Sequence, residues 1–295
     1  MTRRIEVIGV PSSMGAFVPG QEAAPAALRE AGLTDALRAR GFLIDDRGDS
    51  PERRWFPDRE HPQAQHVQAV ADVALETAER VAGCDGLTLV LGGDCTIGLG
   101  TVAGLQRRGD GRVGLLYFDL HSDMNVPSSV REGALDWMVL GHGLGLGGAD
   151  PVLAKAFDRV PLIEPDELWL FALGSSGTAF EQEQVGRLGI RRTSVEHVAA
   201  DPEGAASTTL EAFAPGFERI AVHFDVDVID FVDLPLSENA DRNTGLSFDQ
   251  TLRALGVLMR HPAVASLTVT ELNPAHDPDG SAIARFVEGF ARALE

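Results

Sequence analysis

Short apolar runs alternate with helical patterns along nearly the whole 295-residue chain, and this alternation limits the possible folds more than any other feature. It is the signature of repeated strand–helix–strand units around a parallel sheet. Runs such as LTLVL and VGLLYF are continuously apolar, as expected for parallel strands covered on both faces. We therefore predict an α/β fold, a three-layer α/β/α sandwich with a central, mostly parallel sheet. The expected strands are 5–9, 42–45, 87–91, 113–118, 167–172, 219–224 and 265–270; the expected helices are 24–40 with a break near Gly32, 63–82, 96–107, 151–159, 179–188, 248–260 and 281–294.

Composition narrows the class of protein further. No linker interrupts the pattern, so residues 1–295 are expected to form a single domain. The formal charge of −19, from 44 acidic and 25 basic residues, argues against nucleic-acid binding, which needs clustered cations. No apolar run approaches the ~20 residues that cross a bilayer. Only two cysteines are present and the N-terminus has no signal-peptide pattern, so we expect a cytoplasmic location.

The residues with metal-binding chemistry lie just past four of the expected strands, where parallel sheets bind ligands. Because residues two apart in extended chain point the same way, the acids and histidine of Asp-x-His-x-Asp can converge, as can the acids of Asp-x-Asp. A single Asp-x-Asp often only caps a helix, but several such groups at successive strand ends predict a metal site. Carboxylates favour hard or borderline ions such as Mn²⁺, and this many ligands favours two ions. The candidate ligands are Cys95, Asp119, His121, Asp123, Asp225 and Asp227, followed at a later strand end by Glu271.

Motifs in a consistent order resemble those of the ureohydrolase family, the binuclear manganese amidinohydrolases that include arginase and agmatinase. They are IGVPSSMGAFVPGQEAAPAALREAGL near the N-terminus, then LGGDCTIGLG, FDLHSDMN, HFDVDVID and TELNP. The resemblance covers nearly the whole chain. It implies an eight-stranded parallel sheet, and a homo-oligomer, either a trimer or a hexamer.

The resemblance also implies roles for individual residues. Glu271 would bind the guanidinium of a small substrate, and Asp123 would orient a water activated between two divalent ions, most plausibly Mn²⁺. Attack on the guanidinium carbon would release urea and an amine. Asp119 and Asp225 would bridge the two ions. The first ion would bind Cys95, Asp119, Asp123 and Asp225, and the second Asp119, His121, Asp225 and Asp227.

The first departure from the family pattern is Cys95, which stands in GGDCT where the family has the histidine of GGDHS. A thiolate is a softer ligand than imidazole, so the first position would shift towards Zn²⁺, Fe²⁺ or Co²⁺, or bind Mn²⁺ more weakly. Some family members that act on N-hydroxyarginine carry cysteine here. The alternative is a buried neutral thiol beside a single-metal or empty site.

Further departures concern the proton donor and the substrate. Asp136 occupies the position of a proton-shuttling histidine, and a carboxyl group among other carboxylates can act as a general acid; His142 is the alternative. Asn125 matches a residue that contacts the α-carboxylate of arginine, but Glu132 replaces its helping hydroxyl and would repel a carboxylate. Arginine, N-hydroxyarginine, agmatine and similar guanidino compounds therefore all remain candidate substrates.

These observations favour a metal-dependent amidinohydrolase. The first rival is a non-catalytic or mononuclear relative that binds a guanidino metabolite or a partner protein, because both the ligand histidine and the shuttle histidine are changed. The second is a single-zinc deacylase, which would use Asp119, His121 and Asp225 but has no need for Asp227 or Glu271.

Overall fold

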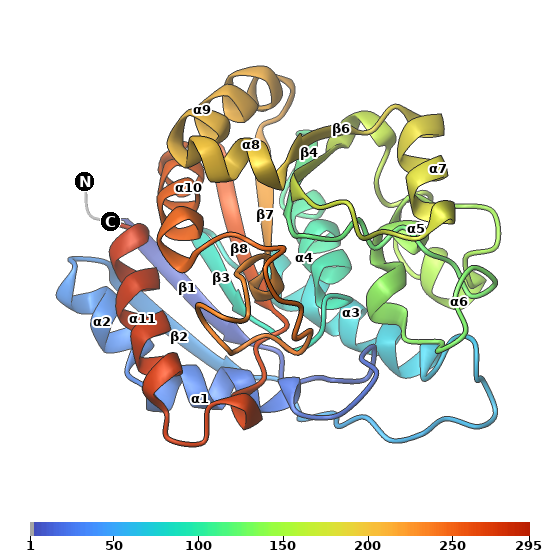
Figure 1. Ribbon diagram of the computed structural model, residues 1–295, viewed down its shortest axis with the longest axis horizontal. Coiled ribbons are helices and arrows are strands. Elements are labelled where there is room, and N and C mark those ends of the chain that lie inside the picture. Colours follow the sequence, from blue (N-terminus) through green and yellow to red (C-terminus); the bar gives the residue numbers. More distant parts are fainter. Residues whose placement is uncertain (1–2) are drawn as a thin grey trace.

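The computed structural model, which describes residues 3–295, confirms the three-layer α/β/α sandwich (Figure 1). Its centre is an eight-stranded sheet with the order β2-β1-β3-β8-β7-β4-β5-β6, and every neighbouring pair is parallel. The strands are β1 (Arg4–Gly9), β2 (Leu43–Asp49), β3 (Leu87–Leu91), β4 (Val113–Phe118), β5 (Leu168–Leu173), β6 (Arg191–Ser194), β7 (Arg219–Asp225) and β8 (Val264–Thr270).

Helices cover both faces of this sheet. One face carries α1 (Ala24–Glu30), α2 (Leu33–Ala39), α8 (Val195–Ala200), α9 (Pro202–Phe213), α10 (Phe248–Arg260) and α11 (Ser281–Ala293). The other carries α3 (Val67–Ala82), α4 (Ile97–Gln106), α5 (Val139–Gly143), α6 (Pro151–Ala154) and α7 (Ala179–Leu188). Single-turn 3₁₀ helices are η1 (Gln21–Ala23), η2 (Leu135–Met138), η3 (Pro165–Glu167), η4 (Ala214–Gly216), η5 (Val226–Val228) and η6 (Pro274–His276).

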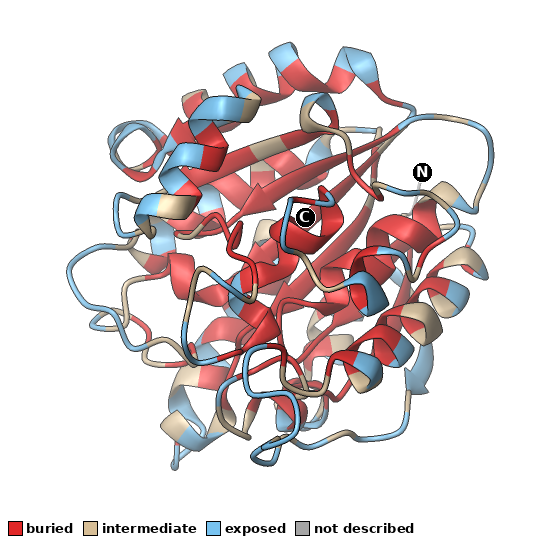
Figure 2. Ribbon diagram, turned by 90° about the vertical axis from the view of Figure 1, so that its right-hand side faces the viewer, coloured by how far each residue is buried: buried red, intermediate tan, exposed pale blue. Residues whose placement is uncertain are grey.

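Two hydrophobic cores, one on each face, hold the layers together. All five residues of β3 and all six of β4 are buried, which explains their unbroken apolar sequences. The ribbon coloured by burial shows strands buried along most of their length and helices exposed only on their outer sides (Figure 2). Within residues 3–295, the structure contains no helix long and apolar enough to cross a membrane.

The predicted elements differ from the structure mainly where the apolar pattern is weak. The edge strand β6 has the sequence RRTS and only one buried residue, so it shows no apolar run. Helices α8 and α9 were also not predicted; α9 is rich in small residues that do not form a clear apolar stripe. The predicted helix 24–40 does break at Gly32, which has a positive φ of 85°. The predicted helix 151–159 is wrong beyond Ala154, where α6 ends.

Strand order explains where the site forms. Strands β3, β8, β7 and β4 are consecutive neighbours in the middle of the sheet and run in the same direction. The segments that follow them therefore meet at one edge. Parallel sheets bind their ligands at this carboxyl edge.

Candidate metal centre

These four central strands place the six predicted metal ligands, together with the predicted substrate-binding residue Glu271, at the same edge of the sheet. The side chains come from the loop between β3 and α4, the loop after β4, the end of β7 with η5, and the residue after β8. All are buried except His121, whose side chain is 21% exposed. In strand order they are Cys95; Glu271; Asp225 and Asp227; and Asp119, His121 and Asp123.

Asp119, His121 and Asp227 form one compact group. The His121 Nδ1 atom lies 2.9 Å from Asp227 Oδ2 and 3.5 Å from Asp119 Oδ1. Candidate ligand atoms of all three residues lie within 4.8 Å of one another. Asp225 joins this group because its Oδ1 accepts a 2.7 Å hydrogen bond from the backbone N–H of Asp227. The group contains the residues expected at the second metal position.

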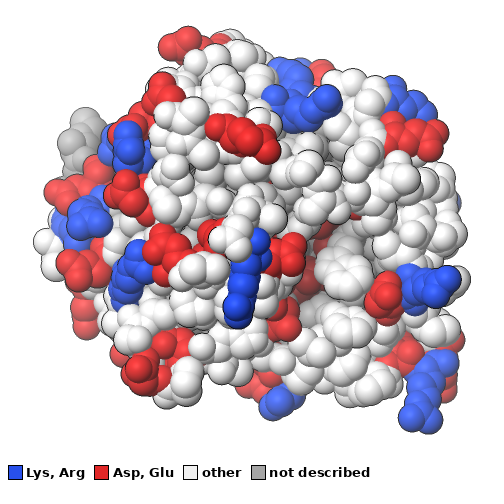
Figure 3. Space-filling view, viewed as in Figure 1, with Lys and Arg blue, Asp and Glu red and all other residues white. Residues whose placement is uncertain are grey.

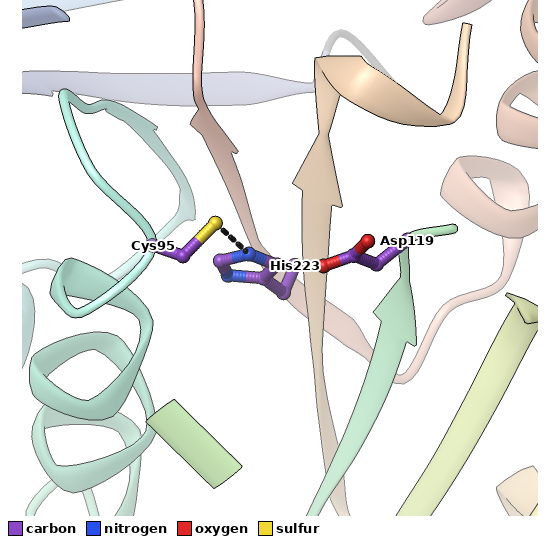
Figure 4. Close-up of side chains that lie close together, drawn as sticks. All are labelled: Cys95, Asp119 and His223. Carbon is purple, nitrogen blue, oxygen red and sulfur yellow. Dashed lines mark hydrogen bonds between the residues drawn. The ribbon is translucent and has the colours of Figure 1, made fainter. Parts of the chain in front are cut away.

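Cys95 lies at the centre of a second group. Its thiol donates to Asp225 Oδ2 over 3.0 Å, and its Sγ lies 3.1 Å from Thr270 Oγ1 and 3.3 Å from His223 Nε2. Candidate ligand atoms of Cys95, Asp119 and His223 lie within 4.8 Å of one another (Figure 4). Cys95 thus lies beside Asp119 and Asp225, two of the residues expected to share its metal ion, and His223 of β7 lies next to them.

Backbone strain marks two of the predicted catalytic residues. Asp123 has a φ of 46° and Glu271 a φ of 65°, which side chains other than glycine adopt rarely and at a cost of about 1 kcal/mol or more. The Tyr117 hydroxyl donates to Asp123 Oδ2 over 2.5 Å, and Gln21 Nε2 donates to Glu271 Oε2 over 2.7 Å. The surrounding structure therefore holds both carboxylates in place.

The carboxyl groups of the site perturb one another. Burial and the charge of Asp227 raise the pKa of Asp119 to about 6, and burial with the charge of Asp94 raises the pKa of Asp136 to about 8. Burial, followed by neighbouring carboxylates, also raises the pKa of Glu271. Burial opposes the ionised form of Asp227 as well, but the charge of His121 outweighs it and lowers the pKa of Asp227.

Unpaired oxygen atoms show that the donor set fits divalent cations. Among the described residues, Asp119 Oδ2, Asp227 Oδ1 and Glu271 Oε1 are buried and have no hydrogen-bond partner. Buried polar atoms are nearly always paired, so these oxygens fit a site that binds cations or a ligand. Carboxylate, imidazole and thiolate groups are all ligands of borderline divalent ions.

The metal-free protein is expected to lose stability as pH rises. The pKa values of Asp119 and Asp136 are higher in the folded chain than the ~3.9 of an unfolded aspartate, so folding favours their protonated forms. That contribution is complete below pH ~4 and is lost as pH rises through about 6 and then about 8. In chelator-treated protein, thermal melting should occur ~5 °C or more lower at pH 8.5 than at pH 5.

Saturating Mn²⁺ at pH 8.5 supplies the control for this prediction, because it should restore the melting temperature. A melting temperature that is independent of pH in metal-free protein would contradict the prediction.

The two groups open onto a cleft of about 530 Å³. Its lining contains eight acidic side chains and, among the described residues, no lysine or arginine. Acidic atoms surround a hollow near the middle of the face in Figure 3. Phe17 and Trp137 stack on the cleft wall with ring centroids 6.0 Å apart, and both remain partly exposed. The cleft therefore suits a small cationic ligand.

The predicted substrate-binding and proton-transfer residues line the cleft, with the exception of His142. Asn125, Glu132 and Asp136 all line the cleft. Asn125 Oδ1 already accepts bonds from Ser129 and Thr178, so the amide nitrogen is the group that it can offer a ligand. Glu132 is exposed at the cleft.

Asp136 lines the cleft, whereas His142 does not. Asp136 Oδ1 accepts a 2.7 Å hydrogen bond from the Cys95 N–H, and its carboxyl group lies close to that of Glu271. His142 does not line the cleft; its Nδ1 lies 2.8 Å from Met138 O, and its Nε2 accepts a hydrogen bond from the Asp150 N–H. With both ring nitrogens engaged in α5 packing, His142 is not placed to exchange protons with a ligand.

Several residues of the site were not predicted, and four of them contact the predicted residues or their loops. Tyr117 and His223 lie inside apolar strands, and their rings stack with centroids 4.2 Å apart. Gln21 binds Glu271 from a segment 250 residues away, which no local motif could indicate. Glu181 reaches the cleft from α7, where its Oε1 accepts bonds from Ser122 Oγ and the Met124 N–H. Only His223 carried a usable signal, because it lies two residues before Asp225 in HFDVDVID.

Comparisons with known proteins identify the family and the fold of the chain. A family model described as "Arginase family" matches residues 3–294. The arginase of Bacillus caldovelox is 28% identical over 283 residues, which cover 92% of each chain. The solved structure of that arginase superposes with a TM-score of 0.87 at 24% identity, covering 99% of this chain and 98% of that one. The arginase of Entamoeba histolytica, solved in complex with L-ornithine, gives a TM-score of 0.88 at 23% identity, with 100% and 99% coverage.

Proposed function

The chain belongs to the arginase family of hydrolases, and from that membership we propose that it is a metal-dependent amidinohydrolase. It cleaves a guanidino C–N bond of a small substrate and releases urea, or a urea derivative, and an amine. The observation that carries this proposal is the convergence of the Asp119, His121 and Asp227 group with Cys95 and Glu271 in one acidic cleft.

The residues of the two groups would hold two divalent cations. Asp119, His121, Asp225 and Asp227 suit Mn²⁺, whereas the thiol of Cys95 favours a softer ion at the other position. When bound, the cations supply Lewis acidity and activate water for attack. Asp123, held by the Tyr117 hydroxyl, orients that water.

Glu271 receives the guanidinium. Gln21 donates to Oε2, whereas Oε1 accepts no N–H from the described residues and lies beside the Asp136 carboxyl group, so Oε1 can accept an N–H of the substrate. A cation next to this carboxyl group favours its ionised form, so substrate binding offsets the burial and repulsion that raise its pKa. The strained backbone at Glu271 fixes the carboxylate before the substrate arrives.

Asp136 supplies the proton for the departing amine. Its pKa of about 8 keeps it mostly protonated at neutral pH, which a general acid requires. It lies beside Glu271, and therefore beside the bound guanidinium.

The cleft lining favours a substrate whose tail is neutral or positively charged. Glu132 and Glu238 line the cleft without a lysine or arginine among the described lining residues, so a carboxylate tail would be repelled. Agmatine-like compounds fit this lining best. Arginine and N-hydroxyarginine stay in the candidate set because Asn125 offers an amide N–H₂ to a carboxylate.

Metal analysis combined with a urea-release screen tests the proposal. The protein is purified after manganese supplementation, its metals are quantified, and urea release is measured from arginine, N-hydroxyarginine and agmatine. Two ions per chain with urea from one substrate would support the proposal. Absence of bound metal after supplementation would overturn it in favour of a binding protein.

Substituting Cys95→His is expected to raise Mn²⁺ affinity about tenfold, because imidazole is a harder ligand than thiolate. The buried Sγ lies 3.0 Å from Asp225, so an imidazole introduced there enters the same ligand group. Calorimetric titration of the chelator-treated variant with Mn²⁺ measures the change. Equal affinities in the parent and the variant would show that Cys95 is not a ligand; Cys84→Ser, at the other buried cysteine, is the matched control.

A further inference from the structure

His223 is a fully buried imidazole directly behind the site. It lies in β7 two residues before Asp225, so the strand's period of two places both side chains on the same face of the sheet. Its side chain is about 1% exposed and does not line the cleft. His223 therefore contacts the ligand group from its buried side, next to Cys95, and not from the cleft.

The surrounding packing forms a slot for a flat ring. One side of the imidazole stacks on Tyr117, with ring centroids 4.2 Å apart and planes 7° apart. Near its Nδ1 edge lies Gly98 in the first turn of α4, where an added Cβ would come within 2.6 Å of Nδ1. Nδ1 therefore faces α4, whereas Nε2 faces Cys95 Sγ at 3.3 Å and Thr270 Oγ1 at 3.2 Å (Figure 4).

The contacts of His223 do not account for a purely structural histidine. Buried histidines normally satisfy both ring nitrogens, but Nδ1 of His223 has no hydrogen-bond partner among the described residues. The Thr270 hydroxyl, 3.2 Å from Nε2, can donate a hydrogen bond to it, whereas the Cys95 thiol donates to Asp225 and leaves its sulfur facing the ring. Nε2 then carries the lone pair, which is the form of imidazole that binds metals.

We propose that His223 is a metal ligand of the first position, together with Cys95 and Asp119. This inference rests on the proposed binding of two divalent ions. The candidate ligand atoms of these three residues already lie within 4.8 Å of one another. His223 of β7 thus supplies the imidazole that the family has at position 95, and Cys95 supplies a thiolate as an additional ligand.

This ligand set gives the two positions different metal preferences. A thiolate and an imidazole with one carboxylate favour Zn²⁺ or Co²⁺ over Mn²⁺. The other group has one imidazole, from His121, and otherwise carboxylates, which favour Mn²⁺. The protein would then hold a mixed pair of ions, with the softer one at Cys95.

X-ray absorption spectroscopy of the full-length protein tests this ligand set. Chelator-treated protein is loaded with Mn²⁺ and one equivalent of Zn²⁺, and the zinc shell is measured. We expect one sulfur and one imidazole per zinc. In His223→Ser the sulfur should remain, the imidazole contribution should disappear, and Zn²⁺ affinity should fall roughly 100-fold.

Two further variants make the result independent of any folding defect. His61→Asn removes an exposed imidazole far from β7 in sequence and should leave the zinc shell unchanged. Cys95→His/His223→Ser moves the imidazole back to position 95, and it should abolish the sulfur signal and reverse the preference to Mn²⁺. Recovery of metal binding in this double variant would show that the loss in His223→Ser is a loss of ligand.

The possible outcomes separate this inference from the proposed function. An unchanged imidazole contribution in His223→Ser would overturn the role of His223 and leave amidinohydrolase activity intact as a proposal. Zinc bound by sulfur and imidazole, without urea from any guanidino substrate, would support His223 and count against the proposed function. Failure of the parent to bind any divalent ion would overturn both.

Discussion

Asp227→Ala is expected to reduce urea release at least ~1000-fold while the protein stays folded. Asp227 lies 2.9 Å from His121, its Oδ1 has no hydrogen-bond partner among the described residues, and its N–H binds the Asp225 carboxylate. Loss of this carboxylate removes a ligand from the second metal position. Because the substitution also removes the partner of His121, the metal-free variant should melt at a lower temperature than the parent but still unfold cooperatively.

Metal stoichiometry, urea release and thermal melting measured on the same preparations test this expectation. Asp249→Ala, which removes an exposed carboxylate in the first turn of α10, is the matched control and should keep full activity. Asp123→Ala should lose activity in the same way, because it removes the carboxylate held by Tyr117. Unchanged turnover in both Asp227→Ala and Asp123→Ala would rule out the mechanism.

The central strands and the residues after them could be predicted because both follow local rules. Strand β3 reads LTLVL since it is buried on both faces, and Asp119 and His121 follow β4 at the carboxyl edge of the same sheet. The edge strand β6, with only Thr193 buried, has no such pattern. Prediction succeeded in the middle of the sheet, where packing on both sides constrains every residue; of the edge strands, β2 was predicted only in its first half and β6 was missed.

The supporting residues of the site could not be predicted as readily. Gln21 meets Glu271 through tertiary packing alone, since 250 residues separate them. Asp123 was expected to point alongside Asp119 as in an extended strand, but its φ of 46° shows that the chain has left the extended conformation by then. The direction of the Asp123 side chain depends on the hydrogen bond from the Tyr117 hydroxyl, and the Asp123 carbonyl accepts hydrogen bonds from two N–H groups of α5. The motif indicates neither contact.

The sequence points to His223 only through its spacing of two residues from Asp225. A lone histidine inside an apolar strand usually belongs to the core, so this spacing alone does not indicate a ligand. Cys95 lies 128 residues away, and only the fold brings the two together. A changed ligand and the residue that compensates for it can therefore come from different strands.

Glu271→Gln should lower kcat/KM about 1000-fold or more while leaving two ions bound. The substitution preserves shape but removes the charge that binds the guanidinium. It also places an amide beside Gln21, whose Nε2 now donates to Glu271 Oε2 over 2.7 Å. Because Glu271 contacts substrate in this mechanism and is not among the expected metal ligands, metal content and the zinc shell should stay unchanged.

This pattern distinguishes substrate binding from metal binding at the same cleft. Asp227→Ala should lose metal and activity together, whereas Glu271→Gln should lose activity alone. Glu288→Gln, an exposed carboxylate on α11, is the control for the neutral substitution. Steady-state kinetics with the best guanidino substrate, together with metal analysis, measures both effects. If Glu271→Gln lost metal as Asp227→Ala does, Glu271 would belong to the metal group, and the guanidinium would have to bind elsewhere in the cleft.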